Sequence, residues 1–318
     1  MGQRSAYLAN DQGRNLVDAR IAAGLPMASV EGGCFCCRYD DLEANLMRMA
    51  AWPVDAVFCE AVGSCTDVVA TVVHPLERAA LHSVGQVTAV IDPQTLAHGL
   101  GVPDPDGDVE YLMHKQIEEA DILLLNRRSG SSEALVERAR AVAVGINPAA
   151  NVLVVDAATG EGIETWLQNL MESHGPARPA LDIDYDRYAA AEAAMAWLNA
   201  TCAVAPGSGE GFASSLLQRL ISHPALKGRI VHAKATFTGA TEEWAAVTAT
   251  QSTPRVVSLG SGTGAQVLTL NLRAVAQPQA TEAAVRQELD RGQTDGTLTG
   301  PVVLDCFAPA YPVPQHRL

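Results

Sequence analysis

Lysine is nearly absent from this sequence. The chain of 318 residues has three lysines, Lys115, Lys227 and Lys234, and arginine supplies the other basic side chains. Acidic residues outnumber basic ones by 36 to 22, which gives a formal net charge of −14 at pH 7. A surface with this excess of negative charge repels phosphate backbones, so we expect no nucleic-acid partner.

Long apolar runs are also missing. No stretch approaches the roughly 18–20 apolar residues that a membrane-spanning helix needs, so we expect no membrane association. The opening residues, MGQRSAYLANDQG, contain no hydrophobic signal segment. Three of the seven cysteines stand together in CFCC at 34–37, a pattern that indicates metal or redox chemistry rather than an extracellular disulfide framework. We therefore predict a cytoplasmic protein.

The composition is that of a folded globular chain. Hydrophobic residues make up 48% of it and charged residues 18%. A chain of this length can bury a large core and is expected to form two domains. The segment HGPARPALDID at 174–184 combines proline, glycine and charge, which is typical of a boundary. We therefore predict one domain over 1–177 and a second over 178–318.

The first half alternates short apolar runs with helical stretches, the pattern of a parallel sheet with helices on its faces. Six runs are predicted to be strands: Tyr7–Ala9, Met27–Val30, Val54–Cys59, Val87–Ile91, Ile122–Leu125 and Val152–Val155. Polar residues follow them, namely Asn10, Glu31, Glu60, Asp92, Asn126 and Asp156. Because ligands of open α/β sheets bind beyond the carboxyl ends of the strands, these six residues together are expected to line a site, although any one of them alone is better explained as a strand cap. The fold class is α/β, with a doubly wound, mostly parallel sheet.

The second half has a different rhythm. AEAAMAWLNATCAV at 191–204 is compatible with either a helix or a long strand. Helical patterns at 211–223 and 280–290 alternate with strand patterns at 229–237 and 265–275. If 191–204 is a strand, the order is that of a ferredoxin-like βαββαβ domain. We expect a smaller α+β domain that ends in a loose tail, PAYPVPQHRL at 309–318.

The strongest chemical signal is EGGCFCCRYDDL at 31–42. Thiolates are soft ligands that favour zinc, copper(I) or iron–sulfur centres. Three sulfurs within four positions, preceded by two glycines, can converge on one ion where the backbone turns sharply. We predict a metal site formed by Cys34, Cys36 and Cys37, and an open one, because this stretch supplies no fourth ligand. The alternatives are a buried cluster of small apolar side chains and a redox pair.

Two further stretches carry nucleotide-switch features. In DAVFCEAVGSCTD, at 55–67, an apolar strand ends at Glu60 and Gly63 follows three residues later. In nucleotide switches such an acid acts on Mg²⁺ or water, and the glycine amide meets the terminal phosphate. The ordinary alternative is a turn from strand to loop. In ADILLLNRRSG, at 120–130, Asn126 stands where an Asn-Lys-x-Asp guanine motif would begin, but Arg127 and Ser129 replace the lysine and the aspartate.

Together these stretches resemble the CobW-like branch of the CobW/HypB/UreG metallochaperone GTPases, members of the SIMIBI class of P-loop proteins. The residues from Gly33 to Cys37 form the most family-specific element. Glu60-Ala-Val-Gly63 is similar to the Glu-x-x-Gly of that branch, and Asn10-Asp11-x-Gly13 is similar to its early Asn-Glu/Asp element. The stretch ATGEGIETWL, within 151–171, is also similar to HypB-type proteins.

The resemblance implies a GTP-dependent protein that binds a transition metal and delivers it to a client metalloprotein, or that activates a metalloenzyme or a corrinoid (cobalamin) enzyme. Zn²⁺ or another soft transition metal would occupy the cysteine site. The matching positions for GTP and Mg²⁺ are Asp11, Glu60, Gly63 and Asn126, and Glu60 is the catalytic candidate.

The sequence departs from this family at the phosphate loop. The family begins with a strand and a glycine-rich loop that ends in Gly-Lys-Thr/Ser, wraps the phosphates and places Mg²⁺. No GxxxxGK[ST] occurs in this sequence, and none of the three lysines follows a glycine. Residues 1–13 correspond to the second strand of the family domain, so we expect the first strand and its loop to be absent. With Ser129 replacing the aspartate, GTP binding is expected to be impaired or lost.

Two explanations of this departure stay open: an upstream start of the gene product, and a degenerate family member that kept the metal site and lost the switch. The favoured function is therefore a metallochaperone or metalloenzyme activator. The alternative is a non-catalytic metal-binding or scaffold protein that retains the GTPase fold, and a thiol redox protein is least favoured. Whether the chain is an enzyme stays undecided. A sheet without an interior strand would expose an edge, so a homodimer is also expected.

Overall fold

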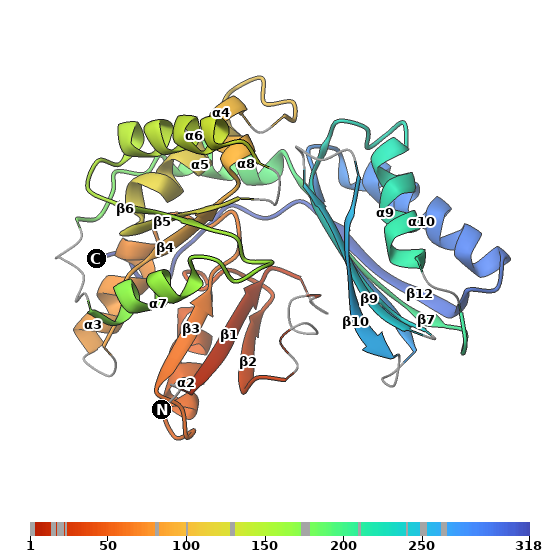
Figure 1. Ribbon diagram of the computed structural model, residues 1–318, viewed down its shortest axis with the longest axis horizontal. Coiled ribbons are helices and arrows are strands. Elements are labelled where there is room, and N and C mark those ends of the chain that lie inside the picture. Colours follow the sequence, from red (N-terminus) through yellow and green to blue (C-terminus); the bar gives the residue numbers. More distant parts are fainter. Residues whose placement is uncertain are drawn as a thin grey trace. The chain divides into compact units, whose positions relative to one another are not determined.

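The computed structural model of the protein is drawn in Figure 1, and it describes every residue except 1–3, 14–16, 18–21, 23, 80–82, 100, 128–130, 173–178, 209–210, 240, 249–252 and 262–265. Contacts divide the chain into two compact units. Unit 1 consists of Met1–Cys34, Ala44–Val62 and Ala189–Tyr311, and unit 2 of Phe35–Glu43, Gly63–Tyr188 and Pro312–Leu318. Each unit combines segments from both halves of the sequence, and the boundary at 177/178 stays a prediction.

Unit 1 contains a three-stranded parallel sheet. Its central strand β1 (Ser5–Asp11) pairs with β2 (Met27–Glu31) on one side and β3 (Ala56–Glu60) on the other. Helix α2 (Tyr39–Met49) connects β2 to β3 along the chain. Leu8 and Ala9 of the central strand β1 are buried, whereas Cys59 near the end of β3 is exposed.

Unit 2 contains a second three-stranded parallel sheet, ordered β4 (Thr88–Ile91), β5 (Ile122–Asn126) and β6 (Asn151–Val155). Side chains of β5 alternate between the two faces, as in any strand. Leu123 and Leu125 pack in a cluster with α4 (Pro93–His98) and α6 (Glu133–Ile146). Ile122 and Leu124 face the opposite way, toward α7 (Ile163–Glu172). Helices therefore cover both faces, which makes this sheet doubly wound.

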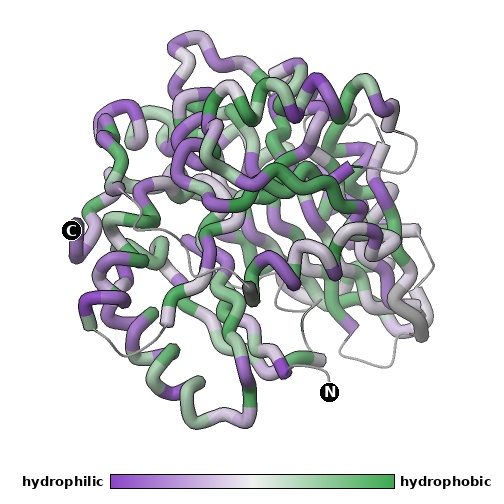
Figure 2. Tube along the Cα trace, turned by 60° about the vertical axis from the view of Figure 1, so that its left-hand side comes forward, coloured by the Kyte–Doolittle hydropathy of each residue, from purple (hydrophilic) through white to green (hydrophobic). Residues whose placement is uncertain are grey.

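The remaining helices of unit 2 are a π-helical turn (Val69–Val73), α3 (His74–Ala79), α5 (Asp108–Glu119) and the start of α8 (Tyr185–Ala193). In Figure 2 the trace of the helices alternates between hydrophobic and hydrophilic residues, as expected for helices with one buried face. Among the residues that the structure describes, no helix has both the length and the apolar composition needed to cross a bilayer.

The α/β fold and all six predicted parallel strands are confirmed, but they form two sheets rather than one. Within the described residues β3 pairs with β1 alone, and β4 pairs with β5 alone.

The second part of unit 1 is a six-stranded antiparallel sheet, ordered β10-β9-β8-β11-β7-β12. Its elements are β7 (Ala196–Val204), α9 (Phe212–Ser222), β8 (Ile230–Thr238), β9 (Thr241–Thr248), β10 (Arg255–Ser261), β11 (Val267–Ala274), α10 (Pro278–Thr294) and β12 (Leu298–Phe307). Without the β9–β10 hairpin this is the predicted βαββαβ order, and the ambiguous segment 191–204 is the end of α8 followed by a strand. The strands β9, β10 and β12 were not predicted.

Helices α9 and α10 lie side by side on one face of this sheet (Figure 1). The core beneath them is apolar and includes Leu216, Leu217 and Leu220 of α9 with Leu268 and Leu270 of β11, all fully buried. The chain thus forms a second, smaller domain fold of the α+β class, as predicted.

The expectation of a loose tail at 309–318 is wrong. Within unit 2 the segment 312–318 forms backbone hydrogen bonds from Gln315 N to Cys36 O (2.9 Å) and from Leu318 N to Ala70 O (2.9 Å). Periodicity could not reveal this order, because the segment is neither helix nor strand and is held by individual side chains.

Candidate metal centre

The turn after β2 is shaped by a glycine and an asparagine. Gly32 has φ +77°, a left-handed conformation in which a Cβ would be strained. Its N–H donates to the carbonyl of Asp11 at 3.1 Å. The side-chain amide of Asn10, only 8% exposed, donates to the carbonyls of Val30 (3.0 Å) and Gly33 (2.7 Å). Asn10 therefore fixes the start of the segment 32–38, which we call the cysteine loop.

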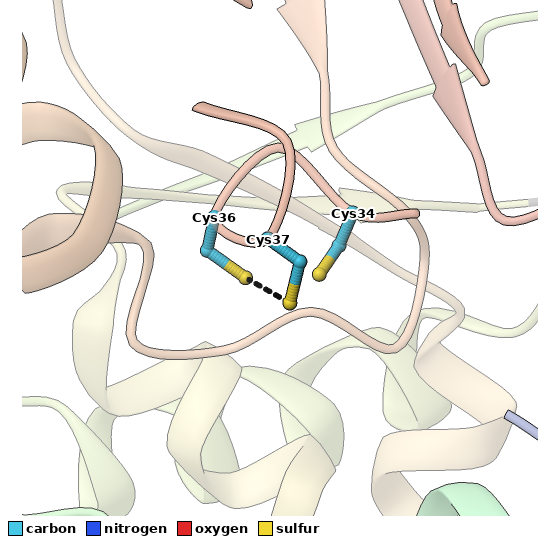
Figure 3. Close-up of side chains that lie close together, drawn as sticks. All are labelled: Cys34, Cys36 and Cys37. Carbon is cyan, nitrogen blue, oxygen red and sulfur yellow. Dashed lines mark hydrogen bonds between the residues drawn. The ribbon is translucent and has the colours of Figure 1, made fainter. Parts of the chain in front are cut away.

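The cysteine loop brings three thiols together. The Sγ atoms of Cys34, Cys36 and Cys37 all lie within 4.8 Å of one another, and those of Cys36 and Cys37 are 3.7 Å apart. Figure 3 shows the three sulfur atoms on one side of the loop. Cys34 and Cys36 are buried and Cys37 is half-buried. The three predicted metal ligands thus lie in one cluster.

The spacing of the sulfurs is compatible with a shared ion. Two thiolates bound tetrahedrally to one zinc at about 2.3 Å stand about 3.8 Å apart. The 3.7 Å between Cys36 and Cys37 is close to that value, and the upper limit of 4.8 Å requires only small side-chain rotations. No fourth His, Cys, Asp or Glu of the described residues joins the group. A three-thiolate site of this kind keeps one coordination position open, as exchangeable sites do.

The structure contains no disulfide among the seven cysteines, all of which lie in described residues. Burial raises the pKa of Cys306 to about 11, which keeps that thiol protonated and a poor ligand at neutral pH. The remaining cysteines lie outside the cluster.

Two of the four predicted nucleotide-site residues lie in unit 1. The carboxylate of Asp11 accepts hydrogen bonds from Nη2 of Arg273 at 3.1 and 3.0 Å and from the N–H of Gly13 at 2.7 Å. The Arg273 guanidinium is 3.7 Å from the ring centroid of Trp197, and its side chain is 5% exposed. Asp11 thus joins the end of β1 to β11 of the antiparallel sheet. Glu60 is exposed and accepts a hydrogen bond from the hydroxyl of Tyr7.

The other two predicted nucleotide-site residues lie in unit 2. The carbonyl of Gly63 accepts a hydrogen bond of 2.8 Å from the side-chain amide of Gln116. Oδ1 of Asn126, at the end of β5, accepts from the N–H of Ala157 at 3.1 Å and so ties β5 to the loop after β6. Ser129 lies outside the described residues. The assignment of these residues to a nucleotide site stays a prediction.

Sequence reasoning did not identify Asp67, which is 1% exposed and the only described non-glycine residue with a positive φ, +61°. Its carboxylate accepts hydrogen bonds from the hydroxyl of Tyr185 at 2.6 Å and from Nε of Arg317 at 2.8 Å. Burial, followed by the bond to Asp67, raises the pKa of Tyr185, so this hydroxyl remains a donor. The only signal in the sequence was the position of Asp67 shortly after the Glu-x-x-Gly element.

Glu119 at the end of α5 supports the same loop. Its carboxylate accepts a hydrogen bond from the N–H of Val69 at 2.6 Å. Burial is the main cause that raises the pKa of Glu119 to about 7, and the nearby charge of Asp67 adds to it. Two buried carboxyl groups therefore meet where the chain enters the π-helical turn.

Comparison with known proteins gives one family and several distant structures. The family described as CobW/HypB/UreG, nucleotide-binding domain, matches residues 1–154. No curated protein matches the chain. The Zn(II)-bound YjiA GTPase from E. coli is 12% identical, with 92% of this chain and 99% of that chain covered and a TM-score of 0.33. A Zn(II)-bound triple mutant of YjiA is 14% identical, covering 91% and 90%, with a TM-score of 0.35.

The hydrogenase maturation factor HypB from Archaeoglobus fulgidus is 20% identical, with 54% of this chain and 76% of that chain covered and a TM-score of 0.37. Structural similarity at TM-scores this low gives no information about the site. The assignment to a family therefore depends on the family match and on the motifs within it. Residues 1–154 are thus similar to the nucleotide-binding domain of the CobW/HypB/UreG family.

Proposed function

We propose that this protein is a metallochaperone, or an activator of a metalloenzyme or corrinoid enzyme, that binds a soft transition metal ion through Cys34, Cys36 and Cys37. The observation that carries the proposal is the convergence of three Sγ atoms within 4.8 Å on a single loop. Thiolates select soft ions, and zinc is the first candidate because its tetrahedral bond length matches the spacing.

The open coordination position favours transfer over structural binding. A structural zinc site is closed by four protein ligands, whereas the cluster offers three among the described residues. A client metalloprotein could donate the fourth ligand and then compete for the ion. Because thiolates must stay reduced to bind metal, we place the protein in the cytoplasm.

The metal assignment is tested by metal analysis of protein purified under reducing conditions. Wild type is expected to contain about one zinc per chain. The variant Cys34→Ala/Cys36→Ala/Cys37→Ala is expected to contain none. The matched control is Cys59→Ala/Cys306→Ala, which removes thiols outside the cluster and should keep the metal. Undiminished metal content in the triple variant would place the site elsewhere, and a Cys36–Cys37 disulfide without metal would favour the redox alternative.

We further propose that GTP binding is impaired or lost in this chain. The sequence lacks GxxxxGK[ST], and Ser129 stands where the guanine-selecting aspartate is expected. Phosphoryl transfer in P-loop proteins needs the loop lysine and a Mg²⁺-holding hydroxyl. The second candidate function, a non-catalytic metal-binding or scaffold protein with the GTPase fold, is supported by the same observation.

Purified protein is therefore expected to show no appreciable GTP hydrolysis in the presence of Mg²⁺. Glu60, the catalytic candidate, is the matched probe for this expectation. A measured turnover that disappears with Glu60→Ala would establish a working switch and would remove the scaffold alternative. We also include a homodimer among the proposed partners, since strands β3 and β4 each leave one edge without a partner strand in the described residues.

A further inference from the structure

One residue of the segment 312–318, Gln315, contacts both the cysteine loop and the start of α2. The N–H of Gln315 donates to the carbonyl of Cys36 at 2.9 Å. Its Oε1 accepts from the N–H of Asp40 at 3.0 Å, and its Nε2 donates to the carboxylate of Asp40 at 3.1 Å. The next residue, His316, lies edge-on to Tyr39 with 4.7 Å between ring centroids.

The contact with Asp40 satisfies a backbone donor at the start of α2. Asp40 lies in the first turn of α2, where backbone N–H groups have no acceptor within the helix. Gln315 supplies that acceptor and holds the carbonyl of a metal-ligand residue at the same time. The segment therefore fixes both the cysteine loop and the start of the helix that follows it.

The other end of the segment is tied to Asp67. Nε of Arg317 donates to Oδ2 of Asp67 at 2.8 Å, and Nη2 of Arg317 donates to the carbonyl of Leu181 at 2.7 Å. The N–H of Leu318 donates to the carbonyl of Ala70 at 2.9 Å. A carboxylate that is 1% exposed needs a charged or hydrogen-bonding partner, and Arg317 supplies the only positive charge paired with it in the described residues.

Asp67 occupies a conformation that its surroundings must hold in place. A non-glycine residue with φ +61° is in the left-handed region, where its Cβ lies too close to the following carbonyl oxygen. The carbonyl of Asp67 accepts from N (3.0 Å) and Oγ1 (2.6 Å) of Thr71, so the residue sets the start of the π-helical turn. Asp67 also follows Gly63 of the Glu-x-x-Gly element by four residues.

We propose that Gln315 and Arg317 are positioning residues of the metal centre, and that the segment 312–318 transmits the state of the cysteine loop to the loop 63–71. All the contacts that carry this proposal lie within unit 2. If metal binding shifted the three thiolates, the carbonyl of Cys36 and the N–H of Gln315 bonded to it would shift as well. Arg317, two residues further along, would then change the restraint on Asp67. The proposal rests on the proposed metal-binding function but not on GTP binding.

Hydrogen–deuterium exchange of the full chain with and without zinc tests the transmission. Zinc is expected to slow exchange of 64–71 as well as 34–40 in wild type. In Arg317→Ala the protection of 64–71 is expected to disappear while that of 34–40 remains, and Arg317→Lys should restore part of it, because lysine keeps the charge but not the forked geometry. Arg286→Ala, which removes an exposed arginine paired with Glu282 in unit 1, is the matched control.

Zinc affinity, measured by competition with a chromophoric chelator, tests the positioning. Residues that hold metal ligands in place typically contribute 10–100-fold to affinity, so we expect Gln315→Ala and Arg317→Ala to weaken binding about 10-fold. The zinc-free chain gives an independent readout, since both variants should raise the rate at which Ellman's reagent modifies the cysteine loop. If Arg317→Ala does not fold, Gln315→Ala alone decides the result.

The possible results distinguish the proposed metal-binding function from the positioning and transmission roles of the segment 312–318. A wild-type chain that binds no zinc overturns the proposed function, and unchanged thiol reactivity in the variants overturns the positioning role independently. Zinc binding without altered exchange in 64–71 leaves the metal centre intact and overturns the transmission. Variants that match Arg286→Ala in affinity, exchange and reactivity overturn the further inference as a whole.

Discussion

The antiparallel sheet of unit 1 and the parallel sheet of unit 2 bury their central strands to the same extent but differ at their edges. Leu268 and Leu270 of β11 are fully buried, as are Leu123 and Leu125 of β5. The edge strands β10 and β12 of the antiparallel sheet both contain register shifts, between Ser258 and Gly260 and between Thr299 and Val303. Irregularities of this kind prevent further pairing at a sheet edge.

The edge of the parallel sheet has no such protection. Strand β4 has the sequence TAVI, with no proline, charge or register shift, and its Val90 is 64% exposed. Strand β3 of unit 1, AVFCE, has one charged residue, at its end. The antiparallel sheet thus ends in irregular edge strands, whereas β3 and β4 are edge strands without a register shift.

The largest effect is expected at the ion pair between the two sheets of unit 1. Asp11→Ala would leave the guanidinium of Arg273 buried without its carboxylate, and breaking a buried pair in this way costs about 3–5 kcal/mol. Denaturant unfolding should show that loss in the free energy of unfolding, without any nucleotide present. The matched control is Asp55→Ala, whose pair with Arg4 is exposed on both sides, at 62% and 46%, and should cost less than about 1 kcal/mol.

Equal losses in the two variants would mean that Asp11 does not tie the sheets together. A loss of affinity for a guanine nucleotide in Asp11→Ala, with stability unchanged, would instead support the predicted nucleotide role.

A second effect concerns Glu119 in unit 2. Because burial raises the pKa of Glu119 to about 7, from the 4.5 of an unperturbed glutamate, the folded chain binds a proton more tightly than the unfolded chain. The stability that this proton contributes is fully present below about pH 4.5 and is lost as the pH rises through 7. At about 1.4 kcal/mol per pKa unit, the loss amounts to about 3 kcal/mol.

Glu119→Gln keeps an oxygen acceptor for Val69 and cannot ionise. The difference between the free energy of unfolding of wild type and that of the variant should therefore decrease as the pH rises from 4.5 to 7.5. Glu118→Gln, at the next position of the same helix, is the matched control. The assignment fails if both variants follow the same pH profile.

The sequence predicted the structure correctly where buried side chains recur in a regular pattern. All six parallel strands are apolar runs that the fold buries or pairs, and the cysteine cluster follows from three thiols within four positions on a glycine-led turn. Strand β12, LTGPVVLDCF, was not recognised because Gly300 and Pro301 interrupt its pattern and half of its residues are exposed.

The contacts around Asp67 could not be predicted. The pair between Asp67 and Arg317 joins residues 250 positions apart, and neither lies in a periodic element. An isolated charge in a proline-rich segment contains no information about which buried carboxylate it will meet. Such contacts depend on the path of the folded chain, which local pattern does not encode.

The smallest effect on stability is expected at the edge of β4, although its effect on association is larger. Val90 and Val303 are both valines on edge strands, 64% and 61% exposed, but only β12 has a register shift beside its valine. An unprotected apolar edge pairs with another chain, and a lysine at that edge blocks the pairing. We expect Val90→Lys to lower the concentration-dependent association of the protein, measured by light scattering after size exclusion. Val303→Lys should leave association unchanged, and both substitutions should change the free energy of unfolding by less than about 0.5 kcal/mol, as surface changes usually do.

If the two variants lower association equally, the edges do not differ in the way their sequences indicate. If wild type stays monomeric at all concentrations, the edge of β4 is covered by residues outside the described part of the chain or needs no cover.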